Sequence, residues 1–340
     1  MRDTQPISRR HARRGVRWFV TCSALGIVGV LGYTSFSESL VSLSRLRPSY
    51  VVVAILLNLL DWLLGSARIY AISGALYPPL KFISCFKADV SNIFLGGVTP
   101  SQTGGGPAQI YVLYKDGMSF ANATVSSLMC FLATMVFLIG CAVYLTMFPP
   151  SLPLNPSLIF LSRTTIILFV TIIIIFFSSV LRPAIFERLF RALLCRLPRI
   201  QHWMERKGWR EVFVRSIYEY HDIMTFYVTR ARLRLLAGMA FTVLIYLNKF
   251  FIAYVVIRGL GASSSPGEVV YTQMILFLIF YFAPSPGASG VAEFVSGMLM
   301  GHLLPPHSQA VFTILWRSFT LYFGMIVGGI VFFRYLTRDE

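Results

Sequence analysis

The chain of 340 residues is 56% hydrophobic and only 13% charged, and its formal net charge is +16. A soluble domain usually carries about 25% charged residues, so this composition excludes an ordinary soluble protein and favours several membrane spans. The basic excess does not indicate nucleic-acid binding, because the basic residues gather beside apolar runs, as the positive-inside rule predicts.

A basic tail, residues 1–15, opens the chain and is predicted to be cytoplasmic, since six arginines lie in the first 17 residues. The apolar run 16–36 follows without a clear A-x-A cleavage site, so we expect an uncleaved first span. A second span is predicted at 48–75. It contains Asp61 and Arg68, which lie about two turns apart on one helix face. They are either a buried pair that orients two helices or part of a functional site.

The next segment has no arm that is long enough to cross a bilayer. Residues 82–98 are moderately apolar, a Gly- and Pro-rich stretch at 99–107 breaks the helix, and residues 108–114 are helical again. Two short arms around such a turn predict a re-entrant hairpin, whose irregular backbone must be buried in protein or line a wet cavity. The alternative is that Pro and Gly only kink an ordinary membrane helix.

Three more full spans are predicted in the middle of the chain, at 121–148, 158–181 and 235–257. Between the last two lies the segment 182–234 with twelve Lys or Arg. It is predicted to form cytoplasmic amphipathic helices on the membrane surface, which either only fix the topology or also gather anionic lipids. Lys249 lies within the third of these spans, where it either faces a polar cavity or extends to an interface.

A second broken segment covers residues 269–304, with a turn of Pro, Ser, Gly and Ala at 283–290. Glu293 lies near the start of its second arm, and the final span, 308–335, carries Arg317. Two roles are open for Arg317: an ion pair with Glu293 that closes the hairpin, or binding of a lipid phosphate, which suits the planar guanidinium. The start of each second arm also offers free backbone N–H groups as an anion site.

The two breaks share the pattern P-S-x4-G-x-A-[QE]-x7-G at a constant offset. Its positions are Pro100, Ser101, Gly106, Ala108, Gln109 and Gly117, then Pro284, Ser285, Gly290, Ala292, Glu293 and Gly301. One copy enters from the cytoplasm and the other from outside, which is an inverted-topology repeat. The predicted fold is thus a single all-α integral membrane domain over 1–340, with about six full transmembrane helices, two re-entrant helical hairpins and cytoplasmic termini.

The stretches Asn92–Tyr111 and Pro284–Glu293, with Arg317 in the next helix, resemble the flippase-type membrane domain named after lysylphosphatidylglycerol synthase. The resemblance covers nearly the whole chain and implies a lipid-translocating or lipid-handling domain. Relatives act with aminoacylated phosphatidylglycerol, hopanoids or polyprenyl-linked sugars. Because the chain ends at Glu340, just after its last span, we expect the soluble aminoacyl-transfer domain of the synthases to be absent.

The first motif departs from the family pattern. Many relatives read Gly-Gly-Glu-Pro-x-Arg there, whereas this chain has Gly106 in place of the glutamate and Gln109 in place of the arginine. The first hairpin therefore loses both charges, which indicates a different head group or a mechanism that needs no charge at these positions.

The leading hypothesis is a flippase of the cell inner (plasma) membrane that moves an anionic phospholipid or a polyprenyl-phosphate-linked lipid between leaflets. The alternatives are a non-catalytic membrane partner of a lipid-modifying enzyme and an intramembrane lipid transferase or phosphatase. We expect no cofactor and no metal, because the sequence has no Walker motif, no CxxC spacing and no HExxH. The expected partners are anionic lipids, with a homo-oligomer left open. The candidate substrate-binding residues are Asp61, Arg68, Pro100, Ser101, Gly106, Gln109, Lys249, Pro284, Ser285, Gly290, Glu293 and Arg317.

Overall fold

The computed structural model describes residues 46–148, 221–222, 225–283 and 285–337, with ten isolated positions besides (21, 43, 164, 167, 170, 171, 174, 184, 188 and 192). The predicted spans at 16–36 and 158–181, most of the basic segment 182–234, and Pro284 lie outside the described residues. The chain forms two compact units, residues 1–165 with 237–340 and residues 166–236. Except for the first turn of α11, the helices below belong to the first unit.

The described chain is helical, and its order follows the predicted one. The helices are α3 (Pro48–Ser73), α4 (Phe82–Val98), α5 (Gly105–Lys115), α6 (Phe120–Met147), α11 (Arg232–Gly259), α12 (Pro266–Phe282), α13 (Val291–Met300), α14 (Pro306–Arg317), the π-helical turn η1 (Ser318–Tyr322) and α15 (Phe323–Thr337). Within the described residues, four helices are long and apolar enough to cross a membrane: α3, α6, α11 and the continuous run Pro306–Thr337. Four of the predicted full spans are therefore helices with the length and hydropathy that crossing a membrane requires.

Two helix starts differ from the prediction, each for a local reason. α12 begins at Pro266, three residues early, because Ser265 and Glu268 form a capping box in which each side chain accepts from the other residue's backbone N–H. α5 begins at Gly105 although Pro107 was expected to belong to the break. Proline is tolerated in the first helical turn, where its missing N–H has no intrahelical partner to lose.

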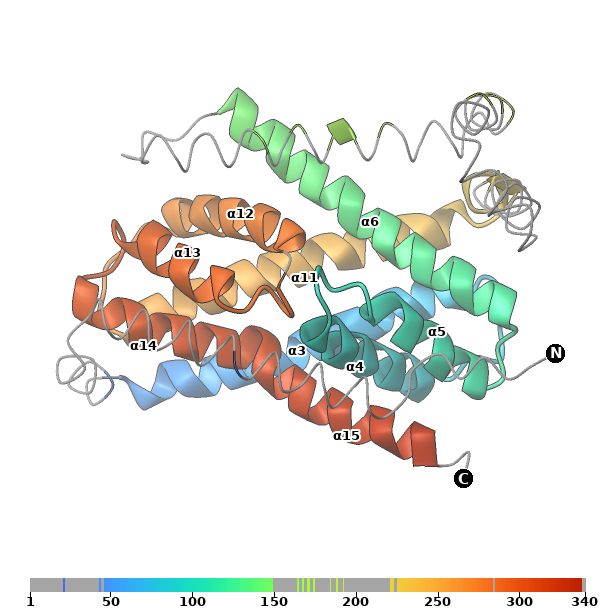
Figure 1. Ribbon diagram of the computed structural model, residues 1–340, viewed down its shortest axis with the longest axis horizontal. Helices are drawn as coiled ribbons and strands as arrows, with labels where there is room; N and C mark the ends of the chain where they lie inside the picture. Colours follow the sequence, from blue (N-terminus) through green and yellow to red (C-terminus); the bar gives the residue numbers. More distant parts are fainter. Residues whose placement is uncertain are drawn as a thin grey trace. The chain divides into compact units, whose positions relative to one another are not determined.

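Both broken segments reverse direction instead of kinking. α5 packs back against α4, and α13 packs back against α12. Figure 1 shows the connecting turns of the two pairs facing each other near the middle of this unit. The turns also touch, since Pro100 and Pro286 form an isolated antiparallel bridge and Ser101 Oγ donates to the Ala283 carbonyl at 3.3 Å. The sequence repeat therefore marks two helix pairs that meet at their turns.

Close helix packing positions the first pair. α4 contacts α3 and α15, and small residues permit the approach. A Cβ on Gly328 of α15 would lie 2.7 Å from the Val90 carbonyl carbon, and one on Gly97 of α4 would lie 2.5 Å from the Met325 sulfur. The α4 helix is thus held close against α15, with the backbone of Val90 facing Gly328 and the side chain of Met325 facing Gly97.

The final span is not a regular α-helix. Between α14 and α15 the five residues Ser318–Tyr322 form a π-helical turn, directly after Arg317. Such single turns occur frequently at functional sites. Asn58 of α3 donates a side-chain hydrogen bond to the Phe319 carbonyl in this turn. The contact ties the irregular turn to a neighbouring span.

Candidate functional site

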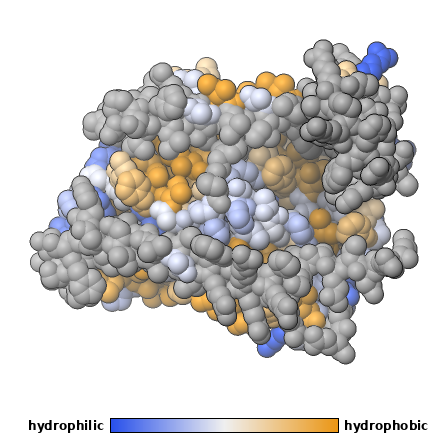
Figure 2. Space-filling model, in the orientation of Figure 1, coloured by the Kyte–Doolittle hydropathy of each residue, from blue (hydrophilic) through white to orange (hydrophobic). Residues whose placement is uncertain are grey.

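A polar cavity of about 270 Å³ lies where the two helix pairs meet the longer helices. Its lining comes from α3, α4, α5, α6, α11, α12 and the final span, and includes residues of both connecting turns. Figure 2 shows hydrophilic residues gathered near the centre of one face, with hydrophobic residues on either side. Five charged residues line the cavity: Asp61, Arg68, Asp89, Lys249 and Arg317.

Asp61 pairs with Lys249. The Lys249 Nζ lies 2.6 Å from Asp61 Oδ2, and the two side chains are 16% and 5% exposed, respectively. Lys249 therefore faces the cavity, which is one of the two positions predicted for it. Next to it on α11, Asn248 donates to the Leu57 carbonyl at 2.9 Å, which adds a second polar contact between α3 and α11.

The predicted Asp61–Arg68 pair is wrong. A separation of seven residues is about 10 Å along a helix, and neither ion pair among the described residues joins these two side chains. Arg68 instead reaches α6, where its Nη1 donates to Thr134 Oγ1 at 3.1 Å. Its Nε is buried and has no hydrogen-bond partner among the described residues. Arg68 therefore keeps donor capacity in the cavity.

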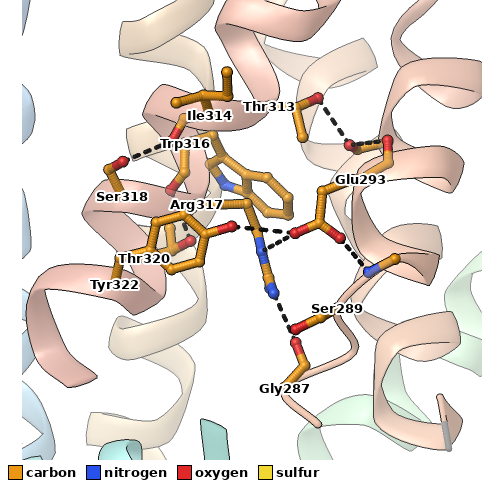
Figure 3. Close-up of polar contacts among 12 residues, drawn as sticks. Gly287, Ser289, Glu293, Thr313, Ile314, Trp316, Arg317, Ser318, Thr320 and Tyr322 are labelled. Carbon is orange, nitrogen blue, oxygen red and sulfur yellow. Dashed lines mark hydrogen bonds and ion pairs between the residues drawn. The ribbon is translucent and has the colours of Figure 1, made fainter. Parts of the chain in front are cut away.

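The predicted Glu293–Arg317 pair is confirmed. Arg317 Nε lies 3.6 Å from Glu293 Oε1, and its Nη2 donates to the Gly287 carbonyl at 2.7 Å (Figure 3). Tyr322 from the π-helical turn donates to the same Glu293 oxygen at 3.1 Å, and its ring lies 5.7 Å from the Arg317 guanidinium carbon. The pair fixes the turn of the second helix pair to the final span.

The predicted anion site at the start of α13 is already occupied by the protein itself. Glu293 Oε2 accepts from the Gly290 backbone N–H at 2.5 Å (Figure 3). A carboxylate in the first turn is stabilised by the free N–H groups and the helix dipole. An external anion would have to displace this carboxylate, so the start of α13 is not an open binding site.

Gln109 occupies the corresponding place in the first pair without a charge. Its side chain is 1% exposed, accepts from Asn92 at 3.1 Å and donates to Cys130 Sγ at 3.7 Å. Gly106 lies one turn earlier, where Ser127 Oγ donates to its carbonyl at 3.4 Å. Both residues line the cavity. The first pair therefore presents a neutral amide surface where the second has an ion pair.

The remaining predicted residues lie at the turns. Pro100 and Ser101 are exposed at the first turn. Ser285 Oγ is buried and has no hydrogen-bond partner among the described residues. None of these three residues lines the cavity, and neither does Gly290 or Glu293. Pro100 and Ser101 take part in the contact between the turns, and Gly290 and Glu293 belong to the cluster around Arg317.

Sequence reasoning missed Asp89. It lies on α4, is 6% exposed and lines the cavity. A Cβ on Gly65 of α3 would lie 2.6 Å from Asp89 Cγ, so the carboxylate occupies space that only a glycine leaves open. The sequence did contain a sign of its role, because a carboxylate within an apolar segment is a candidate functional residue by default. Asn58 and Tyr322 were also missed, and polar side chains in spans are too common to select them by sequence.

The charges around the cavity balance. Lys249 faces Asp61, Arg317 faces Glu293, and Arg68 and Asp89 complete three cations and three carboxylates. The described residues hold no cluster of three His, Cys, Asp or Glu that would bind a metal, and Cys85, Cys130 and Cys141 are free thiols. Charged side chains arranged in this way could bind a polar, charged group inside an otherwise apolar protein.

Comparison with known proteins agrees with this architecture. Residues 19–328 match the family described as "Lysylphosphatidylglycerol synthase TM region". A UPF0104 membrane protein of Archaeoglobus fulgidus shares 22% identity over 304 residues, which is 88% of this chain and 91% of the relative. A UPF0104 membrane protein of Methanocaldococcus jannaschii shares 25% identity over 320 residues, 91% of each chain.

Proposed function

Because the chain belongs to the lysylphosphatidylglycerol synthase membrane-region family and is a multi-pass membrane protein, we propose that it moves an anionic lipid between the two leaflets of the bilayer. The lipid is a phospholipid or a polyprenyl-phosphate-linked lipid of the cell inner membrane, and both termini of the protein are cytoplasmic. The head group passes through the polar cavity while the acyl or prenyl tails stay in the hydrocarbon.

The cavity with two arginines is the observation that carries this proposal. Arg68 and Arg317 reach it from different helices. The Nε of Arg68 is buried and has no hydrogen-bond partner among the described residues, whereas the Nε of Arg317 faces Glu293 in the ion pair. A guanidinium presents donors in a planar fork that matches a phosphate oxygen pair. A buried donor left unsatisfied costs about 1–3 kcal/mol, so a phosphate that accepts from these groups recovers part of that cost.

The two helix pairs support a transport role if they are re-entrant. At 1.5 Å per residue, the 17 residues of α4 or α12 span about 26 Å, and the 10 residues of α13 only about 15 Å, against a hydrocarbon core of about 30 Å. Arms of this length that meet at their turns fit hairpins entering from opposite sides. Inverted broken helices around a midplane site are a common design of secondary transporters.

A lipid-flipping assay tests the proposal. Liposomes carrying fluorescent phosphatidylglycerol are treated with a membrane-impermeant quencher. The purified protein is expected to move labelled lipid from the inner to the outer leaflet, where the quencher reaches it and the fluorescence falls. Arg68→Gln should slow this by roughly 10- to 100-fold, since a charge-assisted hydrogen bond is worth about 1.5–3 kcal/mol. Arg334→Gln is the matched control, because Arg334 is exposed near the end of α15 and outside the cavity.

The assay should be repeated with a labelled polyprenyl phosphate and with a neutral diacylglycerol. Flipping of an anionic lipid but not of the neutral one supports an anionic head-group site. Rates equal to those of protein-free liposomes for every anionic lipid would overturn the proposal and favour a non-transporting partner of a lipid-modifying enzyme.

A further inference from the structure

Asp89 differs from the other two carboxylates at the cavity. Asp61 contacts Lys249, and Glu293 contacts Arg317, Tyr322 and the Gly290 N–H. Asp89 has no hydrogen bond and no ion pair within contact distance among the described residues, although it is 6% exposed and lines the cavity. Its oxygens are therefore free to face whatever enters the cavity.

Asp89 lies in a defined electrostatic setting. Its carboxylate rests against Gly65, which lies on α3 between the turns that carry Asp61 and Arg68. α5 and η1 bring only uncharged residues to the cavity lining, and α15 brings none. The titratable groups around Asp89, from α3, α11, α6 and α4 itself, are Asp61, Arg68, Lys249, Cys130 and Cys85.

An anionic head group alone would leave this site negatively charged. The cavity region has three cations and three carboxylates, with two of the cations already in ion pairs. A bound phosphodiester adds one negative charge and takes Arg68 as its partner. Asp89 then faces both the phosphate and Asp61 without a free counter-charge, and buried unpaired charges are strongly disfavoured.

We propose that Asp89 takes up a proton when the anionic head group binds, so that lipid and proton cross the membrane together. This rests on the proposed function and names its coupling ion. The balance is simple: one negative charge and one proton enter, the Asp89 carboxylate becomes a carboxylic acid, and the total charge of the site is unchanged. On release of the lipid, the charge of Arg68 is no longer neutralised by the phosphate and again favours the ionised Asp89, which returns the proton to water.

Coupling of this kind gives transport a driving force. Movement of a monoanionic lipid with one proton transfers no net charge, so the membrane potential does not act on it. A pH difference across the membrane does act on it, and lipid accumulates in the leaflet on the less acidic side.

The rival role for an unpartnered carboxylate is direct recognition of an ammonium group on the head group.

Titration calorimetry of the full chain in detergent tests the proposal. The ligand is glycerophosphoglycerol, a phosphodiester with one negative charge, since a phosphomonoester itself titrates near pH 6. Measurement in two buffers with different ionisation enthalpies gives the protons taken up for each ligand bound. We expect about one for the wild type at a pH where free Asp89 is ionised, with affinity falling about tenfold per pH unit above that point.

Asp89→Asn should take up no proton and should bind with a pH-independent affinity close to that of the wild type at low pH. Asp116→Asn is the control, because Asp116 lies outside the cavity, where it accepts from Tyr335 at 2.8 Å, and proton uptake should persist. The wild-type measurement stands by itself if Asp89→Asn does not fold.

The possible outcomes separate the two proposals. Binding of the diester without proton uptake by the wild type would overturn proton coupling and leave the head-group site intact. A selective loss of glycerophosphoethanolamine binding in Asp89→Asn, again without proton uptake, would establish ammonium recognition in its place. No binding of any diester would overturn the proposed function, and the coupling with it.

Discussion

At the residue scale, the buried charges matter through their partners. Arg317 is 5% exposed and Glu293 is fully buried, so removal of the arginine leaves a carboxylate without its cation. We expect Arg317→Met to lower the free energy of unfolding by about 3–5 kcal/mol, and Glu293→Gln combined with Arg317→Met to recover part of that loss. Denaturant unfolding in detergent, followed by tryptophan fluorescence, measures both.

A second arginine of the same final span provides the comparison. Arg334 is exposed, so Arg334→Met should change the free energy of unfolding by no more than about 0.5 kcal/mol. If Arg317→Met were as mild as Arg334→Met, or if the double variant were no better than Arg317→Met alone, the ion pair would not be what stabilises this part of the protein.

At the element scale, Gly328 is the glycine of α15 that brings the backbone of α4 closest. A Cβ on Gly328 would lie 2.7 Å from the Val90 carbonyl carbon and 2.9 Å from Phe94 Cβ, so Gly328→Ala must push the two helices apart. We expect a loss of about 1–3 kcal/mol in the free energy of unfolding. Gly140→Ala in α6 is the matched substitution, because a Cβ there meets nothing within 4 Å.

Alanine at position 140 should be neutral or stabilise the protein by up to about 1 kcal/mol, since alanine is a better helix former than glycine. Thermal unfolding of the two variants side by side distinguishes packing from helix propensity. Equal shifts in Tm would contradict the inferred close packing of α4 on α15.

At the scale of the whole molecule, the contact between the two turns is expected to act as a gate. Directly opposed residues of an antiparallel bridge have Cα atoms about 4.5–5.5 Å apart, within the range that a disulfide spans. We therefore expect Pro100→Cys with Pro286→Cys to form a disulfide, to stop lipid flipping when oxidised, and to regain activity with a reductant.

Each single cysteine variant should keep its activity under oxidising conditions. Undiminished flipping by the fully oxidised double variant would show that the turns stay together during transport. The lipid would then have to pass beside the turns and not between them.

The sequence by itself determined the helices and the breaks between them. α3, α6 and α11 begin and end within a few residues of their predicted bounds, because the length of an apolar run is set by the thickness of the bilayer. The P-S-x4-G-x-A-[QE] repeat located both turns, since only small residues and proline permit a reversal there. The ionisable residues in apolar segments also pointed to a pair of Glu293 with Arg317, and to Lys249 as a residue that either faces a cavity or extends to an interface.

Only the tertiary structure decided which charges face one another. Asp61 pairs with Lys249, 188 residues away, and not with Arg68 on its own helix. Sequence spacing places two residues on one helix face, but an ion pair requires contact within about 4 Å, and the packing of α3 against other helices supplies that contact. Likewise, the sequence could single out Asp89 as a carboxylate in an apolar segment but could not place it at the cavity, because Gly65 of another helix leaves the room that its carboxylate occupies.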